Sequence, residues 1–135
     1  MKSLIRNKNL VKQVVDFSGL RNSKIYPSDI DAVIEFDNEV LILIEVKRRG
    51  VEIPLGQKLL LERICNSWHT HKSIVLKAEH NFYDENKNIP IEMTAVTGYY
   101  RNKKWMYYDS FDDAINLLDF INELGVVWNC KKCKF

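Results

Sequence analysis

Asp31, Glu45 and Lys47 are the residues of this 135-residue chain whose types and spacing are best suited to chemistry. Glu45 and Lys47 are two positions apart, so on a β-strand both side chains project from one face. The apolar residues 40–44 lead directly into them, whereas a strand that faces solvent would alternate with polar residues. A charged pair that ends a buried strand is typical of a functional site.

The turn before this strand determines which residues face Glu45. Residues 32–36 are mostly apolar, with two β-branched residues, and indicate an antiparallel partner strand, and residues 37–39 have the composition of a turn. A three-residue turn there places Asp31 opposite Glu45, with Asp29 two positions farther out on the same face. Directly opposed residues have Cβ atoms about 4.5–5.5 Å apart.

Two carboxylates at that distance repel each other unless a cation lies between them. Mg²⁺ (or Mn²⁺) prefers oxygen ligands, takes one or two carboxylates, and keeps water and substrate phosphate in its remaining positions. Such an ion polarises a phosphate and lowers the pKa of its bound water. The Lys47 ammonium would orient that water or stabilise the charge that develops in the transition state. This pattern predicts a metal-dependent phosphodiesterase.

The same residues resemble the motif of the PD-(D/E)xK nuclease superfamily. Its pattern is an acid at the start of a strand, a hairpin, and an apolar run that ends in Glu-x-Lys, matched here by Asp31 and residues 42–47. The resemblance implies that Asp31 and Glu45 are metal ligands. It also implies that the backbone carbonyl of Val46 is a further ligand and that Lys47 is the catalytic lysine.

The chain departs from the motif at the first acid, because Pro27 is followed by Ser28 and not by an aspartate. Asp29 and Asp31 both have the correct face parity, and Asp31 is favoured because it directly precedes the apolar strand. The RecB-like and lambda-exonuclease-like branches place a glutamine on the next helix to hold the metal site or its water, and Gln57 occupies that position. A glutamine that bonds the loop backbone at the helix entry is an equal alternative.

The resemblance implies a Mg²⁺-dependent deoxyribonuclease, and the small size favours a structure-selective endonuclease. Such an enzyme would be similar to junction resolvases or to the stand-alone nucleases of phages and mobile elements, which often form homodimers. One alternative is a non-catalytic module that retains the fold and binds nucleic acid or a protein. Another is a site-specific restriction or homing-type endonuclease.

Basic and aromatic residues supply candidate contacts to DNA. Side chains that could bind phosphates without reading bases are Arg48, Arg49, Arg101, Lys103 and Lys104. Aromatic residues on the expected hairpin near residues 99–108 could stack on bases. Packing of one hairpin face against the final helix is the commoner explanation.

Hydrophobic periodicity and turn residues predict the remaining elements. The expected helices span about residues 8–18, residues 55–69, and a segment from the N-cap Ser110 to Gly125, and the expected strands span about residues 32–36, 40–47, 73–78, 91–100 and 104–108. The resemblance implies a restriction-endonuclease-like αβββαβ core with a C-terminal hairpin and helix. The whole is expected to be one α/β domain, residues 1–135, with a mixed sheet of about four to six strands flanked by helices.

Composition restricts the cellular setting. No apolar run approaches the ~20 residues that cross a bilayer, and no signal peptide follows Met1, so we expect a cytoplasmic protein. The net charge of +2 does not by itself indicate a nucleic-acid-binding protein. Cys130 and Cys133 form a CxxC pair, but a structural Zn²⁺ needs four ligands, and we expect a reduced pair without zinc.

Overall fold

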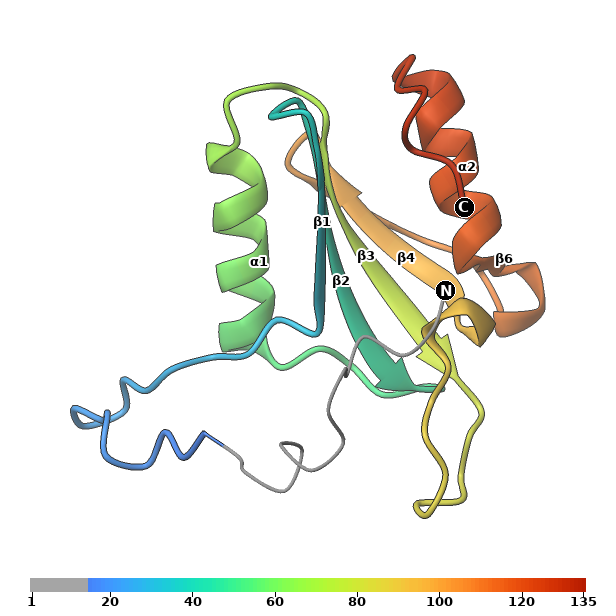
Figure 1. Ribbon diagram of the computed structural model, residues 1–135. Coiled ribbons are helices and arrows are strands. Elements are labelled where there is room, and N and C mark those ends of the chain that lie inside the picture. Colours follow the sequence, from blue (N-terminus) through green and yellow to red (C-terminus); the bar gives the residue numbers. More distant parts are fainter. Residues whose placement is uncertain (1–14) are drawn as a thin grey trace.

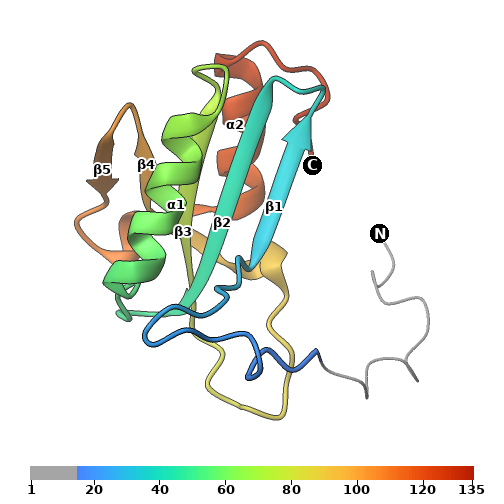
Figure 2. The ribbon, with the colours of Figure 1, turned by 90° about the vertical axis from the view of Figure 1, so that its left-hand side faces the viewer.

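The computed structural model describes residues 15–135, in which a mixed β-sheet lies between two helices, one on each face (Figures 1 and 2). The α/β class and the mixed sheet of the prediction are confirmed. In chain order the elements are β1 (Ala32–Phe36), β2 (Val40–Arg48), α1 (Leu55–Ser67), β3 (Ser73–His80), η2 (Ile91–Met93), β4 (Ala95–Arg101), β5 (Lys104–Tyr107), η3 (Phe111–Asp113), β6 (Ile115–Asn116) and α2 (Leu117–Val127).

The sheet order is β1-β2-β3-β4-β5, and the short β6 pairs with β4. Only β2 and β3 are parallel, and the connection between them is α1. The chain therefore enters α1 at the end of the sheet where β2 and β3 terminate. This end of the sheet, below the first turn of α1 in Figure 2, carries the charged residues of the candidate site.

The β1–β2 hairpin has the predicted register, because Phe36 pairs with Val40 and the pairing continues to Ala32 opposite Ile44. Asp37 and Asn38 have positive φ angles of 50° and 59°, as a type I′ turn requires. Residues of these two types adopt positive φ more readily than most, so the turn sequence itself determines the register.

Each face of the sheet packs on its own helix. The side chains at odd positions of β2, including Leu41 and Leu43, contact Leu61 and Cys65 of α1. The side chains at even positions, including Ile42, face α2 and form the larger core. Since β2 and β3 are covered on both faces, each contains an apolar run, residues 40–44 in β2 and residues 74–76 in β3, as buried parallel strands usually do.

The predicted start and end of the last helix were wrong. Ser110 precedes the short η3 helix, and α2 starts after Asn116, whose side chain accepts hydrogen bonds from the N–H groups of Leu118 and Asp119. Ile115 instead pairs with β4, so tertiary pairing overrides the local helical pattern. Gly125 does not end the helix: it lies inside α2, where an added Cβ would be 2.3 Å from the carbonyl oxygen of Cys133.

Two further predictions differ from the structure at the N-terminal side. The predicted helix over about residues 8–18 lies mostly outside the described residues, and residues 15–18 are not helical. Within residues 15–135, two strands precede α1, where the predicted core order has three. In the same part of the chain, none of the helices is long and apolar enough to span a membrane.

Candidate active site

Glu45 is the most deeply buried carboxyl group of the described chain, with 1% of its surface exposed. It lies on the α1 face of β2, and its neighbour along the strand on that face is Leu43, which belongs to the core beneath α1. The Glu45 Oε2 atom is buried and makes no hydrogen bond within the described residues. An unpaired buried oxygen is costly, so this atom is a candidate ligand for a cation.

Asp31 lies beside Glu45, as the predicted register requires. Its Oδ2 atom accepts a hydrogen bond of 2.7 Å from the backbone N–H of Val46, just beyond the last paired residue of β1. The N–H and C=O of one strand residue point to the same edge, so the Val46 carbonyl also faces this side. The three oxygen donors expected to hold a metal therefore converge at the end of the hairpin.

Burial and the neighbouring acids disfavour ionisation of Glu45. The pKa of Glu45 is raised to about 8, first by burial and then by hydrogen bonding to Asp31 and repulsion from its charge. The nearby Lys47 ammonium opposes this rise, and Asp29 adds to it. Glu45 is thus protonated at neutral pH in the absence of a cation, whereas a divalent ion would favour the ionised form.

An oxygen-only donor set with one unpaired atom fits Mg²⁺ or Mn²⁺, which usually take few protein ligands and retain several waters. Residues 15–135 contain no cluster of three or more histidine, cysteine or acidic side chains placed to hold a metal ion. The candidate site has only two such side chains, because its third expected ligand is a backbone carbonyl. The fit is therefore to a metal that completes its shell with water and substrate, and not to a fully protein-ligated metal.

Two residues that the sequence analysis did not assign extend the site onto β3. Lys77 pairs with Glu45 in the parallel register, and Glu79 pairs with Lys47, so the four side chains share one face. Lys77 and Glu79 are 7% and 6% exposed, and their charged groups are 3.1 Å apart. The signal in the sequence was a Lys-x-Glu pair in an apolar run, but the predicted strand ended at residue 78 and left Glu79 in the following loop.

Glu79 is held by more than its ion pair. One carboxylate oxygen accepts the backbone N–H of Gly50 at 2.8 Å, and the other accepts the Thr97 hydroxyl at 2.6 Å. Burial alone would raise the pKa of Glu79, but these hydrogen bonds and Lys77 outweigh it and lower the pKa. The network fixes the loop after β2 to β3 and β4, and it holds the buried Lys77 ammonium at Glu79, on the face of the sheet that carries Glu45.

Gln57 bonds the loop backbone at the entry of α1, which is the alternative to a role at the metal site. Its Nε2 atom donates a 3.1 Å hydrogen bond to the backbone carbonyl of Asp29, which ties the segment before β1 to the first turn of α1. Asp29 is exposed and lies at the rim of the site. The neighbouring hollow is lined by this segment and by the start of α1, including Tyr26 and Pro54.

The five candidate phosphate-binding residues are divided between the two ends of the sheet. Arg48 and Arg49 lie at the end of β2 beside the site, where their guanidinium groups contact the rings of Tyr83 and Phe111. Arg101 faces α2, and its guanidinium lies over the Trp128 ring. Lys103 and Lys104 belong to the β4–β5 turn at the opposite end of the sheet (Figure 2). The structure therefore places only Arg48 and Arg49 at the same end of the sheet as Glu45, and Arg48, at an even position of β2, projects from the opposite face.

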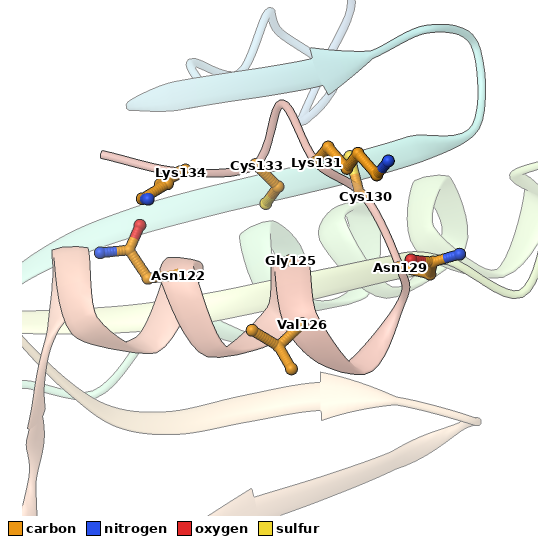
Figure 3. Close-up of a pocket in the computed structure, with 8 residues that line it drawn as sticks. All are labelled: Asn122, Gly125, Val126, Asn129, Cys130, Lys131, Cys133 and Lys134. Carbon is orange, nitrogen blue, oxygen red and sulfur yellow. The ribbon is translucent and has the colours of Figure 1, made fainter.

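The C-terminal cysteine pair lies away from this site, in a hollow against α2 (Figure 3). The Cys133 thiol is buried and donates to the carbonyl of Ile121 at 3.4 Å. Burial, and then the adjacent Cys130, raises the pKa of Cys133 to about 11. A thiol that stays protonated is a poor nucleophile and a poor metal ligand, which supports a packing role. Cys65, the third cysteine of the chain, lies on the other face of the sheet, where its thiol donates to the Ser73 hydroxyl.

No family model, curated protein or solved structure matches the chain significantly. The functional inference therefore depends on the chemistry of the residues themselves. Of the sequence-predicted residues, Asp31, Glu45, Lys47 and Gln57 come together on the α1 face at one end of the sheet.

Proposed function

We propose that this protein is a metal-dependent phosphodiesterase that cuts DNA, with a restriction-endonuclease-like active site on β2. The observation that carries the proposal is the buried Glu45 carboxyl, which has an unpaired oxygen and lies against Asp31. Burying a carboxyl group beside a second acid is destabilising unless the arrangement has a use that requires it. Coordination of Mg²⁺ or Mn²⁺ is such a use, and Lys47 on the same face adds the cation expected of phosphoryl chemistry.

Each residue has a separate part in the proposed hydrolysis. When bound, the metal ion would polarise the scissile phosphate and acidify a bound water. Glu45 and Asp31 would hold the ion as carboxylates, and Asp31 is held in place by the N–H of Val46. Lys47 stabilises the negative charge on the phosphate as water attacks in line with the leaving oxygen. Lys77 and Glu79 keep the neighbouring strand rigid and polar.

A structure-selective endonuclease similar to junction resolvases is the activity that we favour. A homodimer would present two active sites to a branched substrate, and α2 offers a self-association surface because Val126 and Val127 are 82% and 69% exposed. Sedimentation of the purified protein at several concentrations tests the dimer separately from the chemistry.

The direct test is to incubate the purified protein with branched, single-stranded and duplex DNA, each with Mg²⁺, Mn²⁺ or EDTA. We expect cleavage that requires the metal and that falls by at least about 100-fold in Glu45→Gln and Lys47→Ala. Glu123→Gln and Lys131→Ala are the matched controls, because they remove the same charges from exposed positions in α2 and the C-terminal segment. Both controls should cut like the wild type.

Absence of cleavage on every substrate, or equal cleavage by wild type and Glu45→Gln, would contradict the proposal. Binding of DNA without cleavage and without metal binding would instead favour the non-catalytic module that retains the fold. Cleavage at one defined sequence would favour the restriction or homing-type alternative.

A further inference from the structure

Trp105 and Tyr107 form a parallel aromatic pair on β5. Their ring planes differ by 9° and their centroids are 5.5 Å apart. The Lys58 ammonium, which comes from α1, lies 5.1 Å from the Trp105 ring centroid and 5.8 Å from that of Tyr107. Tyr107 is nevertheless 51% exposed, so a large part of its ring surface is open to solvent. The pair therefore presents one exposed ring, that of Tyr107, which is stacked on a partly buried ring and lies beside a cation.

Contacts with α1 and β4 fix the positions of both rings. The Trp105 indole N–H donates a 2.8 Å hydrogen bond to Glu62 of α1, and the Trp105 ring packs against Tyr100 at 5.5 Å. The Tyr107 ring lies over Gly98, where an added Cβ would be only 2.5 Å from its Cδ1 atom. Glycine at this position leaves the room that the ring occupies. A preorganised aromatic surface loses little entropy when a ligand stacks on it.

The aromatic pair lies on the same face of the sheet as the candidate active site. Three successive register pairs connect them: Glu45 with Lys77, Lys77 with Gly98, and Gly98 with Tyr107. Paired residues project from the same face, so this row runs directly across β2, β3, β4 and β5. With strands about 4.8 Å apart, the backbones of Glu45 and Tyr107 are separated by roughly 14 Å.

We infer that Tyr107, supported by Trp105 and Lys58, is a stacking platform for an unpaired nucleotide of the substrate. Bases inside a duplex already stack on their neighbours, so only a single-stranded segment can offer a free face to Tyr107. The Lys58 ammonium would contact a phosphate next to the stacked base. This inference rests on the proposed function, and it makes the substrate class DNA with a single-stranded segment next to the scissile phosphate.

The test measures binding separately from cleavage. Fluorescence anisotropy in EDTA compares a labelled single-stranded oligodeoxynucleotide with a duplex of the same length. We expect Tyr107→Ala to weaken single-strand binding by roughly ten-fold and to leave duplex binding within about two-fold, whereas Tyr107→Phe keeps the ring and the affinity. Met106→Ala is the matched control, because Met106 is the adjacent residue of β5, is 45% exposed and projects from the opposite face.

Two results would overturn the inference: wild-type affinity of Tyr107→Ala for the single strand, or an equal loss in Met106→Ala. Circular dichroism of each variant shows whether it is folded, and a folded Tyr107→Phe keeps the test valid if Tyr107→Ala unfolds. Cleavage assays on the same proteins separate the two proposals. Cleavage by the wild type with no effect of Tyr107→Ala overturns only the platform, and Tyr107-dependent binding with no cleavage overturns only the nuclease.

Discussion

The Asp31 carboxylate accepts a 2.7 Å hydrogen bond from the backbone N–H of Val46, the residue between Glu45 and Lys47. The side chain thereby continues the hairpin ladder by one step after the last backbone pair. One Asp31 oxygen is fixed by this bond, and the carboxylate is held against Glu45 whether or not a cation is present. Asp29, in contrast, is attached through its backbone carbonyl, and its own carboxylate is free at the rim.

This difference predicts unequal roles for the two aspartates. Asp31→Asn should weaken Mn²⁺ binding by more than about ten-fold, because it removes a carboxylate ligand from beside Glu45. Asp29→Asn should change the affinity by less than about three-fold, since its charge reaches the site only through space. Titration calorimetry with Mn²⁺ measures both, and a larger effect of Asp29→Asn would assign the first ligand to Asp29.

The raised pKa of Glu45 predicts that the metal-free protein becomes less stable as the pH rises. The ordinary pKa of 4.5 applies to the unfolded chain, and the folded value is about 8, so between these values the folded state holds the extra proton. Stability should therefore fall through this window by at most about 5 kcal/mol, because the two pKa values differ by about 3.5 and each pKa unit corresponds to about 1.4 kcal/mol.

Urea unfolding in EDTA at pH 5 and pH 9 measures this change, and Glu45→Gln is the reference variant because it cannot ionise. The difference in unfolding free energy between Glu45→Gln and wild type should be larger at pH 9 than at pH 5. Adding Mn²⁺ at pH 9 should restore much of the wild-type loss and none in the variant. An equal pH dependence in both proteins would show that Glu45 has an ordinary pKa.

The buried Lys77–Glu79 ion pair predicts that the stability of the fold depends strongly on both side chains. Glu79→Gln should lower the unfolding free energy by about 3 kcal/mol, because it leaves the buried Lys77 ammonium without its counter-ion. Adding Lys77→Met to that variant should recover part of the loss. The exposed pair of Lys132 with Asp37 is the control, and Asp37→Asn there should cost less than about 1 kcal/mol. Equal losses at the two pairs would contradict this account.

The contact between Gly98 and the Tyr107 ring predicts that substitutions at these two positions have non-additive effects on the unfolding free energy. Gly98→Ala should destabilise the fold by about 1–3 kcal/mol, because its Cβ would overlap the Tyr107 ring. In a Tyr107→Ala background the same substitution should cost clearly less, since the clashing ring atoms are gone. A double-mutant cycle of unfolding free energies gives the coupling. Independent, additive effects would show that the ring does not rest on Gly98.

The positions of the basic residues predict which of them contact DNA. Arg48→Ala should weaken DNA binding and reduce the slope of log affinity against log salt by about one, as expected when one phosphate contact is lost. Lys103→Ala should leave the slope unchanged, because Lys103 lies at the far end of the sheet from Glu45. Binding isotherms at several salt concentrations measure both slopes, and the reverse result would move the DNA path to the β4–β5 turn.

Local sequence was sufficient for the part of the site that lies on one hairpin. Asp37 and Asn38 favour positive φ, so the turn determines the register, and the register brings Asp31 to Glu45. Side-chain alternation then places Lys47 on the same face. The apolar stripe of α1 was predictable for the same reason, because its contacts repeat every three or four residues within one helix.

Only the tertiary structure decided what surrounds the hairpin. Lys77 and Tyr107 join the row of Glu45 through pairings between strands that are far apart in the chain, and no short-range pattern specifies those registers. The same long-range pairing moved Arg101 to the opposite face and delayed the start of α2. The sequence by itself determined the hairpin that carries the candidate site, because neighbouring residues encode its turn and alternation. The sheet that extends the site was decided by packing between distant segments.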